Sequence, residues 1–343
     1  MSIPVENIYF LLGYAWNRLD EKDRVDVSID ETTQLVDLFA KILINATKVL
    51  LKRGIDRSYV DYTGEINGIR GKLELSQTIK SNLLEKQKTI CSYDEFSFDI
   101  LPNRILSSTV YTLCHTTTLD KELRDELYAM SRMLSGITPV SITSSLFRQV
   151  RINRNNRIYG FIMDVCKIIH ESILPSETKG YYRFIDFYRD EAKMAQLFES
   201  FVFNFYKIEQ TAFNIRRESI RWNFEEGVSE YFDYLPLMKT DITLENDARK
   251  IIIDAKFYKE TMKSHFNKER VNSGNLYQLF SYLVNQEEAT DKSVNATGIL
   301  LYPTVQQEYD LEYQYKDHPI HICTINLNMN WRDISKRLHD IIA

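Results

Sequence analysis

The first third of the chain combines helical and extended hydrophobic patterns. Apolar residues recur at helical spacing across residues 31–52, which predicts an amphipathic helix with a core-facing stripe. A glycine-containing turn is expected at Gly64–Gly68, between segments that alternate or carry short apolar runs. The elements expected here are helices at 31–52, 102–117 and 120–134, and further segments at 57–62, 73–79 and 89–98, the last of them a strand.

The second half alternates between helical and extended patterns, which is typical of a mixed α/β domain. The predicted helices cover residues 157–174, 188–208, 275–286 and 330–342. The predicted strands cover residues 213–223, 232–244, 250–258, 296–302 and 319–327. We therefore expect an α+β or mixed α/β protein with an N-terminal α+β region at 1–150 and a second domain at 151–343, the boundary lying within 140–180.

Composition agrees with a globular, cytoplasmic protein. The chain has 343 residues, of which 44% are hydrophobic and 27% charged, and it carries no biased tract. No run approaches the roughly 20 apolar residues of a membrane-spanning helix, and the N-terminus lacks the basic region of a signal peptide. The net charge of −5 does not indicate nucleic-acid binding, yet it leaves room for a local basic groove.

Several common types of site are excluded by spacing. The sequence contains no CxxC pair and no H-E-x-x-H pattern, and it has no recognisable nucleophile elbow. It also contains no G-x-x-x-x-G-K-[ST] loop, so we expect no nucleotide to be bound by this chain. The six histidines are expected to be structural. Buried, unpaired thiols are expected at Cys91, Cys114, Cys166 and Cys323.

Two β-rich segments carry the most informative polar residues. The first is MKTDITL at residues 238–244 and the second is IIIDAKF at residues 251–257, with a polar turn between them. Because side chains alternate along a strand, Asp254 and Lys256 project from one face of the second segment. An antiparallel hairpin would therefore gather Asp241, Asp254 and Lys256.

The position of Asp254 gives these residues a chemical meaning. Asp254 directly follows three isoleucines, and a charge in such a buried strand is costly unless a cation or hydrogen bonds compensate it. Two converging carboxylates suit a hard cation such as Mg²⁺, and a neighbouring lysine can orient a water or stabilise charge on phosphorus. The pattern favours metal-dependent phosphodiester hydrolysis. A salt bridge on an edge strand is the alternative reading of an isolated D-x-K.

The order of these residues resembles the PD-(D/E)xK nuclease superfamily, particularly its RecB-like branch. A helix with Glu199 precedes the two strands, and a helix with Gln278 and Tyr282 follows them. Thr240 stands where the motif has proline, and Asp254 stands where many relatives have glutamate. The resemblance implies a C-terminal restriction-endonuclease-like domain.

The same resemblance implies a role for each residue. Asp241, Asp254 and the backbone carbonyl of Ala255 would be ligands of Mg²⁺, and Lys256 would serve the attacking water. The supporting residues would be Glu199, Gln278 and Tyr282, of which the last two would support the site or DNA. Glu199 also fits a solvated position on its helix.

A second resemblance covers nearly the whole chain. Its segments are IPVENIYFLLGYAW at 3–16, GIRGKL at 68–73, DEFS at 94–97, NRIL at 103–106, KGYYRF at 179–184, TDITL at 240–244, IIIDAKFYK at 251–259 and NLYQLFSYL at 275–283. In this order they look like the McrC family, the nuclease component of modified-cytosine restriction systems. The resemblance implies a partner, the AAA+ GTPase McrB, which forms hexameric rings, binds GTP and recognises methylated DNA. It also implies that the N-terminal region binds that ring and stimulates GTP hydrolysis.

Two groups of basic residues have more than one reading. A cluster without acidic neighbours consists of Arg148, Arg151, Arg154 and Arg157, which could contact DNA phosphates, bind the partner or lie in a solvated loop. Candidates for stimulating the GTPase, by analogy with arginine fingers, are Arg70 and Lys72, together with Arg53 and Arg57. Their alternative is ordinary surface charge beside a turn.

The leading interpretation is a Mg²⁺-dependent DNA endonuclease subunit. It would cleave double-stranded DNA containing methylated cytosine in complex with its GTPase partner, without contact to a membrane. One alternative is a non-catalytic regulator that chiefly stimulates the GTPase. A second alternative is a stand-alone RecB-like repair nuclease, which would leave the long N-terminal region without a role.

Overall fold

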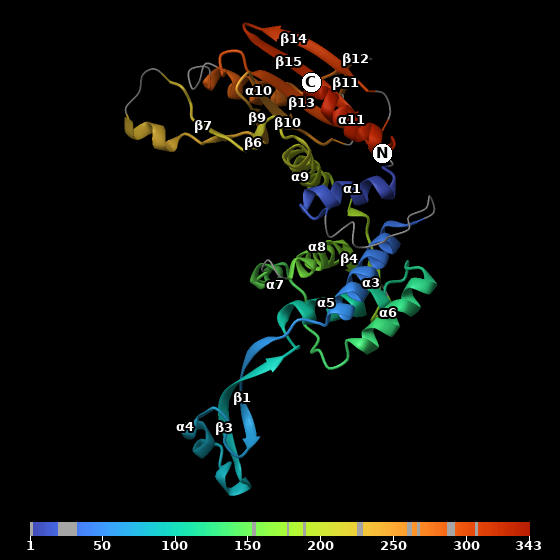
Figure 1. Cartoon of the computed structure of the whole chain (residues 1–343), viewed down its shortest axis with the longest axis vertical. Coiled ribbons are helices and arrows are strands. Elements are labelled where there is room, and N and C mark those ends of the chain that lie inside the picture. The colour runs from blue at the N-terminus through green and yellow to red at the C-terminus, as the bar shows by residue number, and fades with distance from the viewer. Residues whose placement is uncertain are drawn as a thin grey trace. The chain divides into compact units, whose positions relative to one another are not determined.

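The computed structural model describes residues 3–19, 33–152, 156–176, 178–187, 190–224, 229–258, 263–265, 268–286, 292–305 and 308–343 (Figure 1). By its packing the chain divides into two compact units. The sheet unit comprises Met1–Lys22, Ile29–Thr33 and Asp186–Ala343, and the hairpin unit comprises Asp23–Ser28 and Gln34–Ile185. Both units combine helices and strands, which confirms the predicted α+β or mixed α/β class.

This division differs from the predicted ranges 1–150 and 151–343. The chain passes from the hairpin unit to the sheet unit between residues 185 and 186. This boundary lies beyond the predicted one because helix α8 (Arg157–Ser172) packs against helices of the hairpin unit. At the other end, helix α1 (Val5–Ala15) belongs to the sheet unit, where it packs against helix α9. The N-terminal segment is therefore part of the same compact unit as the predicted nuclease residues.

Helix α1 is held in the sheet unit by ring stacking and by hydrogen bonds. Phe10 stacks on Trp331, with ring centroids 4.6 Å apart and ring planes 5° apart. The Asn7 side-chain amide donates to the carbonyl oxygens of Leu327 and Met329 at 2.8 Å each. These contacts are non-local, so no pattern within the first 20 residues could predict them.

The helices of the hairpin unit follow the amphipathic pattern of the sequence. They are α3 (Leu35–Arg53), α4 (Leu75–Lys80), α5 (Leu101–Cys114), α6 (Lys121–Met133), α7 (Ser144–Gln149) and α8, with a 3₁₀ turn η1 (Leu84–Lys86). Helices α3 and α5 each pack against both α6 and α8. The predicted helices at 31–52, 102–117, 120–134 and 157–174 are confirmed apart from their ends, whereas α4 and α7 were not predicted as helices.

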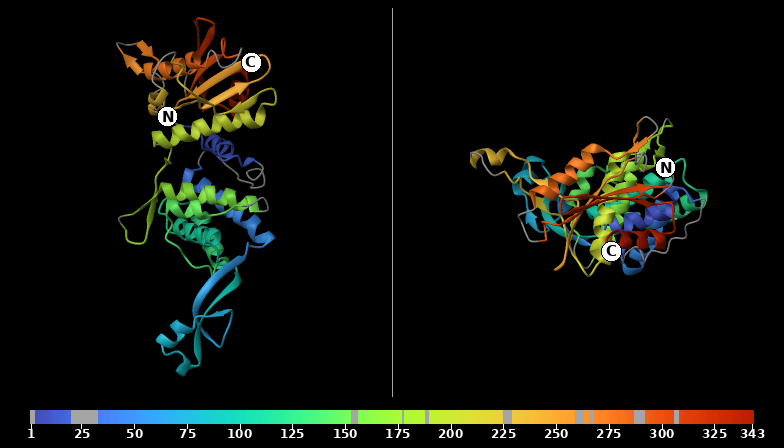
Figure 2. Two further views of the ribbon diagram at one scale, coloured as in Figure 1. Left: turned by 90° about the vertical axis from the view of Figure 1, so that its left-hand side faces the viewer. Right: turned by 90° about the horizontal axis from the view of Figure 1, so that it is seen from above.

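Strands β1 (Ser58–Asn67) and β3 (Lys88–Ser97) form a long antiparallel pair that extends away from helices α3, α5, α6 and α8, with α4 beside β3 (Figures 1 and 2). The short β2 (Lys72–Leu73) pairs with β3, and β4 (Ile173–Pro175) pairs with β5 (Tyr182–Phe184). The predicted turn at Gly64–Gly68 is wrong in its first part, because Gly64 pairs with Cys91 inside the strand. The chain turns at Gly68, whose φ is +90°.

A buried polar network fixes the base of this hairpin on the helices. The Tyr159 hydroxyl donates to Asn103 Oδ1 at 2.6 Å and accepts from the Asp56 N–H at 3.0 Å. Asn103 in turn donates to the carbonyl oxygens of Asp56 at 3.0 Å and Phe98 at 2.7 Å. Each of these side-chain groups has a partner, as buried polar groups require.

The sheet unit contains a six-stranded mixed sheet in the order β14-β15-β13-β10-β9-β6. Its strands are β6 (Asn214–Arg216), β9 (Ile242–Glu245), β10 (Lys250–Ala255), β13 (Thr297–Thr304), β14 (Asp310–Tyr315) and β15 (His318–Asn326). Strands β10, β13 and β15 run parallel, and the other neighbours pair antiparallel. Two smaller pairs are β7 (Ser219–Ile220) with β8 (Met238–Lys239), and β11 (Lys263–His265) with β12 (Lys268–Arg270).

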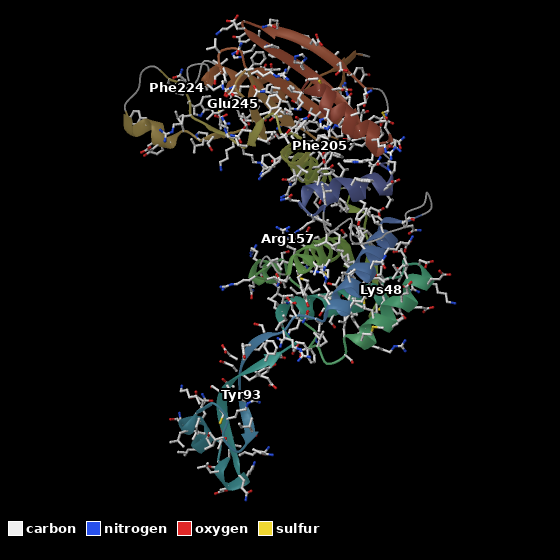
Figure 3. The ribbon with its side chains drawn as sticks, in the orientation of Figure 1. Lys48, Tyr93, Arg157, Phe205, Phe224 and Glu245 are labelled. Carbon is white, nitrogen blue, oxygen red and sulfur yellow. The ribbon has the colours of Figure 1, made fainter. Side chains whose placement is uncertain are left out.

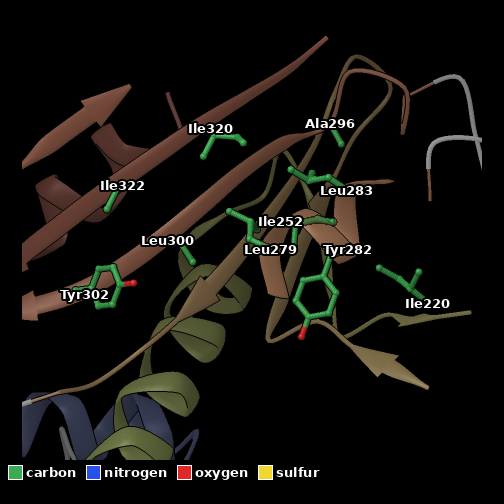
Figure 4. Packing of buried hydrophobic residues seen from close by; sticks show 10 residues of the cluster. All are labelled: Ile220, Ile252, Leu279, Tyr282, Leu283, Ala296, Leu300, Tyr302, Ile320 and Ile322. Carbon is green, nitrogen blue, oxygen red and sulfur yellow. The ribbon is translucent and has the colours of Figure 1, made fainter. Parts of the chain in front are cut away.

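Helices pack on this sheet through a dense apolar core. Helix α9 (Glu191–Glu209) contacts β6 and β10, α10 (Ser273–Asn285) contacts β10 and β13, and α11 (Trp331–Ile341) contacts β15. Figure 4 shows the cluster that joins α10 to the sheet, including Ile252, Leu279 and Leu300. Gly298 allows the close approach, since a Cβ there would lie 2.9 Å from Leu283 Cδ1.

The predicted elements of this unit are largely confirmed. The helices at 188–208, 275–286 and 330–342 and the strands at 250–258, 296–302 and 319–327 are present. The strands at 213–223 and 232–244 are wrong as single strands, because each region divides between two sheets and the second also holds a 3₁₀ segment, η4 (Ser229–Tyr234). All four cysteines are buried and free, as predicted. In the described part of the chain, no helix has the length and apolarity to cross a membrane.

Asp99 joins the end of the hairpin to the helices. It accepts hydrogen bonds from Arg104 Nε and Nη2 at 2.9 Å each, and from the Thr138 N–H at 2.9 Å and hydroxyl at 2.6 Å. Burial by itself would raise the pKa of this carboxyl, but the four donors outweigh burial and lower the pKa to about 2. The ionised form therefore stabilises the folded hairpin unit.

We expect Asp99→Asn to lower the free energy of unfolding by about 2 kcal/mol at pH 7. The folded pKa lies below the ordinary value of 3.8, so this contribution is present above about pH 4 and is lost as the pH falls through about 2. Urea denaturation at several pH values measures it. Asp125→Asn on the exposed side of α6 is the control. If Asp99→Asn lowered the free energy of unfolding equally at pH 7 and pH 2.5, the ionised Asp99 carboxylate would not be the stabilising form.

Candidate functional site

Strands β9 and β10 bring the predicted acidic residues together. They pair antiparallel with Ile242 opposite Ile253. Asp241 directly precedes Ile242 and Asp254 directly follows Ile253, so both lie at the same end of the pair. The predicted hairpin is therefore present in the structure. The Ala255 N–H donates to Asp241 Oδ2 at 3.0 Å, which directs this carboxylate toward the end of β10.

Lys256 lies between the two carboxylates. Its Nζ is 2.8 Å from Asp254 Oδ1 and 3.6 Å from Asp241 Oδ2. Its own N–H donates to the Leu301 carbonyl at 3.0 Å, which continues the pairing of β10 with β13 and fixes the backbone. The three predicted catalytic side chains thus form one cluster.

The Asp254 carboxylate is fully buried, with none of its surface exposed. Burial raises its pKa to about 7; Lys256 opposes this rise, and the negative charge of Asp241 adds to it. Its second oxygen, Oδ2, is buried and accepts no hydrogen bond from the described residues. An oxygen in that situation costs free energy unless a cation or another donor reaches it.

The surrounding sequence explains why Asp254 is held there. Ile251, Ile252 and Ile253 are all buried, and β10 lies between β9 and β13 in the sheet. Because β10 is a central strand, its whole length is covered, and the acidic residue at its end is buried with it. The same hydrophobic run that predicts the strand therefore also determines the environment of the carboxylate.

Helix α10 supplies the predicted supporting residues. Gln278 Nε2 donates to the Tyr282 hydroxyl at 2.6 Å, and that hydroxyl donates to the Lys239 carbonyl at 2.7 Å. Lys239 lies two residues before Asp241, so Tyr282 anchors the segment that leads into the site. Gln278 therefore holds the Tyr282 hydroxyl, and Tyr282 holds the backbone.

Asn275 on the same helix was not predicted from the sequence as a residue of the site. Asn275 Nδ2 donates to the Tyr302 hydroxyl at 2.9 Å, and Asn275 Oδ1 accepts from the Tyr258 hydroxyl at 3.1 Å. Burial raises the pKa of Tyr302 to about 12, and the negative charge of Asp254 also raises it. The signal was available, since Asn275 precedes Gln278 by three positions and so shares its helix face.

Glu199 on α9 lies in the electrostatic neighbourhood of the site. Its Oε1 is 2.8 Å from Arg217 Nη2 in an ion pair. Burial raises the pKa of Glu199, and the charge of Asp241 raises it further. The sequence predicted Glu199 as a residue near the site, but it did not predict the ion pair of Glu199 with Arg217.

The donor set fits a hard divalent cation. Among the residues that the structure describes, no three His, Cys, Asp or Glu side chains are arranged to hold a metal ion. Two carboxylates with a buried, unsatisfied oxygen do meet at the end of β10. Such a set leaves coordination positions for water and substrate oxygens, which Mg²⁺ prefers to an all-protein cage.

The predicted basic residues are distributed over several elements. Arg148 belongs to α7, Arg151 follows that helix, and Arg157, which is labelled in Figure 3, begins α8. All three are exposed. Arg154 lies outside the described residues. The three described arginines therefore do not share one element. Their contact with DNA or with a partner stays a prediction.

Of the residues predicted to stimulate a GTPase, Arg70 and Lys72 lie beside the turn of the hairpin, and Arg53 and Arg57 lie toward its base. The Arg70 guanidinium stacks over the ring of Tyr93 in β3, 4.3 Å from its centroid. Tyr93 is labelled in Figure 3. Lys72 Nζ is 3.1 Å from Glu74 Oε1 and remains largely exposed. Arg53 ends α3, and the Arg57 guanidinium lies over the Phe98 ring near the base of the hairpin.

Comparison with known proteins gives a consistent result. The family model described as "McrBC 5-methylcytosine restriction system component" matches residues 7–303. The chain is 34% identical over 339 residues to the "Type IV methyl-directed restriction enzyme EcoKMcrBC" of Escherichia coli (strain K12), covering 99% of this chain and 97% of that protein.

A solved structure shares the fold. It is a chain of a refined half-complex from a tetradecameric assembly of Thermococcus gammatolerans McrB AAA+ hexamers with bound McrC. The TM-score is 0.56 at 17% sequence identity, and the match covers 98% of this chain and 76% of that chain. The likeness extends over both units described above.

We expect Lys256→Met to destabilise the chain in the absence of metal. The variant leaves the buried Asp254 carboxylate without its cation, and the free energy of unfolding should fall by about 2 kcal/mol or more. Urea denaturation in EDTA measures the change. Lys239→Met, which removes an exposed lysine nearby, is the matched control, and an equal loss in both variants would contradict this account.

Proposed function

The chain belongs to the family of McrBC 5-methylcytosine restriction system components, and on this basis we propose that it is the Mg²⁺-dependent DNA endonuclease subunit of a GTP-dependent restriction complex. One observation carries the nuclease assignment. It is the meeting of Asp241, Asp254 and Lys256 at the buried end of β10, with one carboxylate oxygen lacking a donor.

In this proposal Asp241 and Asp254 hold Mg²⁺, with the Ala255 carbonyl as a further ligand. The bound ion would supply Lewis-acid activation of the phosphodiester and of a water. The protein's contribution is the placement of two carboxylates, one anchored by the Ala255 N–H and the other by the rigid end of a central strand. Both are therefore held in place before any substrate arrives.

Lys256 acts in this proposal as a cation. Burial disfavours its ammonium charge, but the carboxylates of Asp254 and Asp241 outweigh burial and raise its pKa. A lysine that stays protonated cannot remove a proton from water as a general base. It can orient the attacking water and stabilise the negative charge that develops on the phosphate oxygens.

We propose that the chain acts with an AAA+ GTPase hexamer. Its structural relative is described as McrC bound to McrB AAA+ hexamers, and the curated relative as a methyl-directed restriction enzyme. The sequence has no phosphate-binding loop, so GTP would be bound by the partner. The substrate would be double-stranded DNA with methylated cytosine.

The hairpin unit is the part that we propose contacts the partner. Large apolar side chains are exposed around the turn between β1 and β2, on α4 and on η1, namely Ile69, Leu75, Ile79 and Leu84. A cluster of this kind on an exposed hairpin is typical of a protein interface. Arg70 and Lys72 lie in the same region, and in this proposal they act on the GTPase sites of the partner.

Asp254→Ala should abolish DNA cleavage and leave partner binding and GTP hydrolysis close to the wild-type level. The variant removes the buried ligand but alters nothing in the hairpin unit. Plasmid cleavage is measured with methylated and unmethylated DNA, Mg²⁺, GTP and the partner, alongside phosphate release.

Asp247→Ala is the matched control, because Asp247 is an exposed aspartate in the turn between β9 and β10. It should cut as the wild type does. Normal cutting by Asp254→Ala would refute the site. A wild-type chain that stimulates GTP hydrolysis but never cuts DNA would instead favour the regulator, and cutting of unmodified DNA without the partner would favour a stand-alone nuclease.

Replacing Arg70 and Lys72 together by alanine should lower stimulated GTP hydrolysis by about 10-fold or more, if they act as arginine-finger-like groups. The measurement is phosphate release by the partner at saturating concentrations of each variant. Lys80→Ala removes an exposed lysine from neighbouring α4 and serves as the control. Equal losses in the double variant and the control would assign the effect to general surface charge.

A further inference from the structure

The chain changes its pairing partner between β8 and β9. Strand β8 pairs with β7, with Lys239 opposite Ser219, whereas β9 begins at Ile242 and pairs with β10 and β6. Thr240 and Asp241 are the two residues between these strands. The interaction that ends the pairing of β8 with β7 at Thr240 therefore determines the direction of the Asp241 side chain.

Thr240 ends that pairing with its side chain. Its N–H donates to the Glu218 carbonyl at 3.0 Å, as a regular ladder requires. The Glu218 N–H, however, donates to the Thr240 hydroxyl oxygen at 2.9 Å. In a regular antiparallel pair this donor would go to the backbone carbonyl of residue 240. The hydroxyl thus takes the place of the carbonyl and releases the following peptide from the ladder.

The released peptide leads directly to the metal-binding carboxylate. Asp241 turns to β10 and accepts from the Ala255 N–H at 3.0 Å. The Thr240 hydroxyl also lies 2.9 Å from the Thr243 hydroxyl in β9, and Thr240 is buried. The Thr240 side chain therefore links Glu218, which directly precedes β7, to Thr243 in β9.

Glu218 is itself held by a buried cation. Lys250 Nζ is 2.9 Å from Glu218 Oε2, and only 1% of the Lys250 side chain is exposed. A lysine so deeply buried is costly unless paired. Lys250 begins β10, the strand that carries Asp254 near its other end, so the ion pair fixes Glu218 relative to the strand of the second carboxylate.

From these contacts we propose that Thr240 is a positioning residue for Asp241, held by Glu218 and through it by Lys250. The inference rests on the proposed function, in which Asp241 is a metal ligand. It also explains why threonine can occupy the proline position of the resembling motif. Proline interrupts a ladder because it has no N–H, while Thr240 interrupts it with its hydroxyl.

The test compares hydroxyl-deleting variants on either side of Asp241. Thr240→Val and the smaller Thr240→Ala remove the acceptor of the Glu218 N–H, Thr240→Ser keeps it, and Thr243→Val removes only the neighbouring hydroxyl. Mn²⁺ is the probe, and its binding to the full chain is measured from the electron paramagnetic resonance signal of the free ion. Thermal midpoints are recorded for each variant.

We expect Thr240→Val and Thr240→Ala to weaken Mn²⁺ binding by about 10-fold or more, as losses of outer-shell partners do. Thr240→Ser and Thr243→Val should bind as the wild type does. Thr243→Val should nevertheless lower the thermal midpoint, because it removes the buried hydrogen bond between the Thr240 and Thr243 hydroxyls. Stability alone therefore cannot produce the expected pattern.

Two results would overturn the proposal. One is wild-type Mn²⁺ affinity in both hydroxyl-deleting variants at position 240, and the other is an equal loss of affinity in Thr243→Val. Cleavage is measured in parallel with Mg²⁺, GTP and the partner. A wild-type chain that binds Mn²⁺ but never cuts DNA refutes the nuclease function, while the affinities still decide the role of Thr240.

Discussion

The buried carboxylate of Asp254 is the constraint on which the arrangement of the sheet unit depends. It lies at the end of a central strand with none of its surface exposed, and one of its oxygens has no donor among the described residues. Such a charge can persist only where strong packing outweighs its cost and a cation lies beside it. The isoleucine run of β10 and the helix α10 provide the packing, and Lys256 provides the cation.

Unlike the Asp254 carboxylate, the polar side chains of helix α10 beside the site have hydrogen-bond partners. Tyr282 both accepts and donates a hydrogen bond, and Asn275 joins two tyrosine hydroxyls. These satisfied groups hold the backbone and the helix in place, so the unsatisfied oxygen stands at a rigid position. Where a protein leaves one buried polar atom unpaired within a satisfied network, that atom is a reasonable position for a ligand.

The sequence could predict the site because its signals are local. Three isoleucines followed by aspartate predict a buried strand end, and the spacing of Asp254 and Lys256 places both on one face. The split of residues 213–223 and 232–244 could not be predicted, because it depends on which sheet each half joins. Helix α1 was missed as part of the sheet unit for a similar reason, since the contacts of Asn7 and Phe10 lie near the C-terminal end of the chain.

These non-local contacts change how the chain should be divided. The main segment of the hairpin unit, Gln34–Ile185, lies between two segments of the sheet unit along the chain, since Ile29–Thr33 precedes it and Asp186–Ala343 follows it. A fragment beginning at residue 186 would lack the helix that stacks on Trp331 and packs against α9. In the proposed function, the partner-binding part is therefore joined to the nuclease part at both of its ends, and the nuclease core is complete only when the N-terminal helix is present.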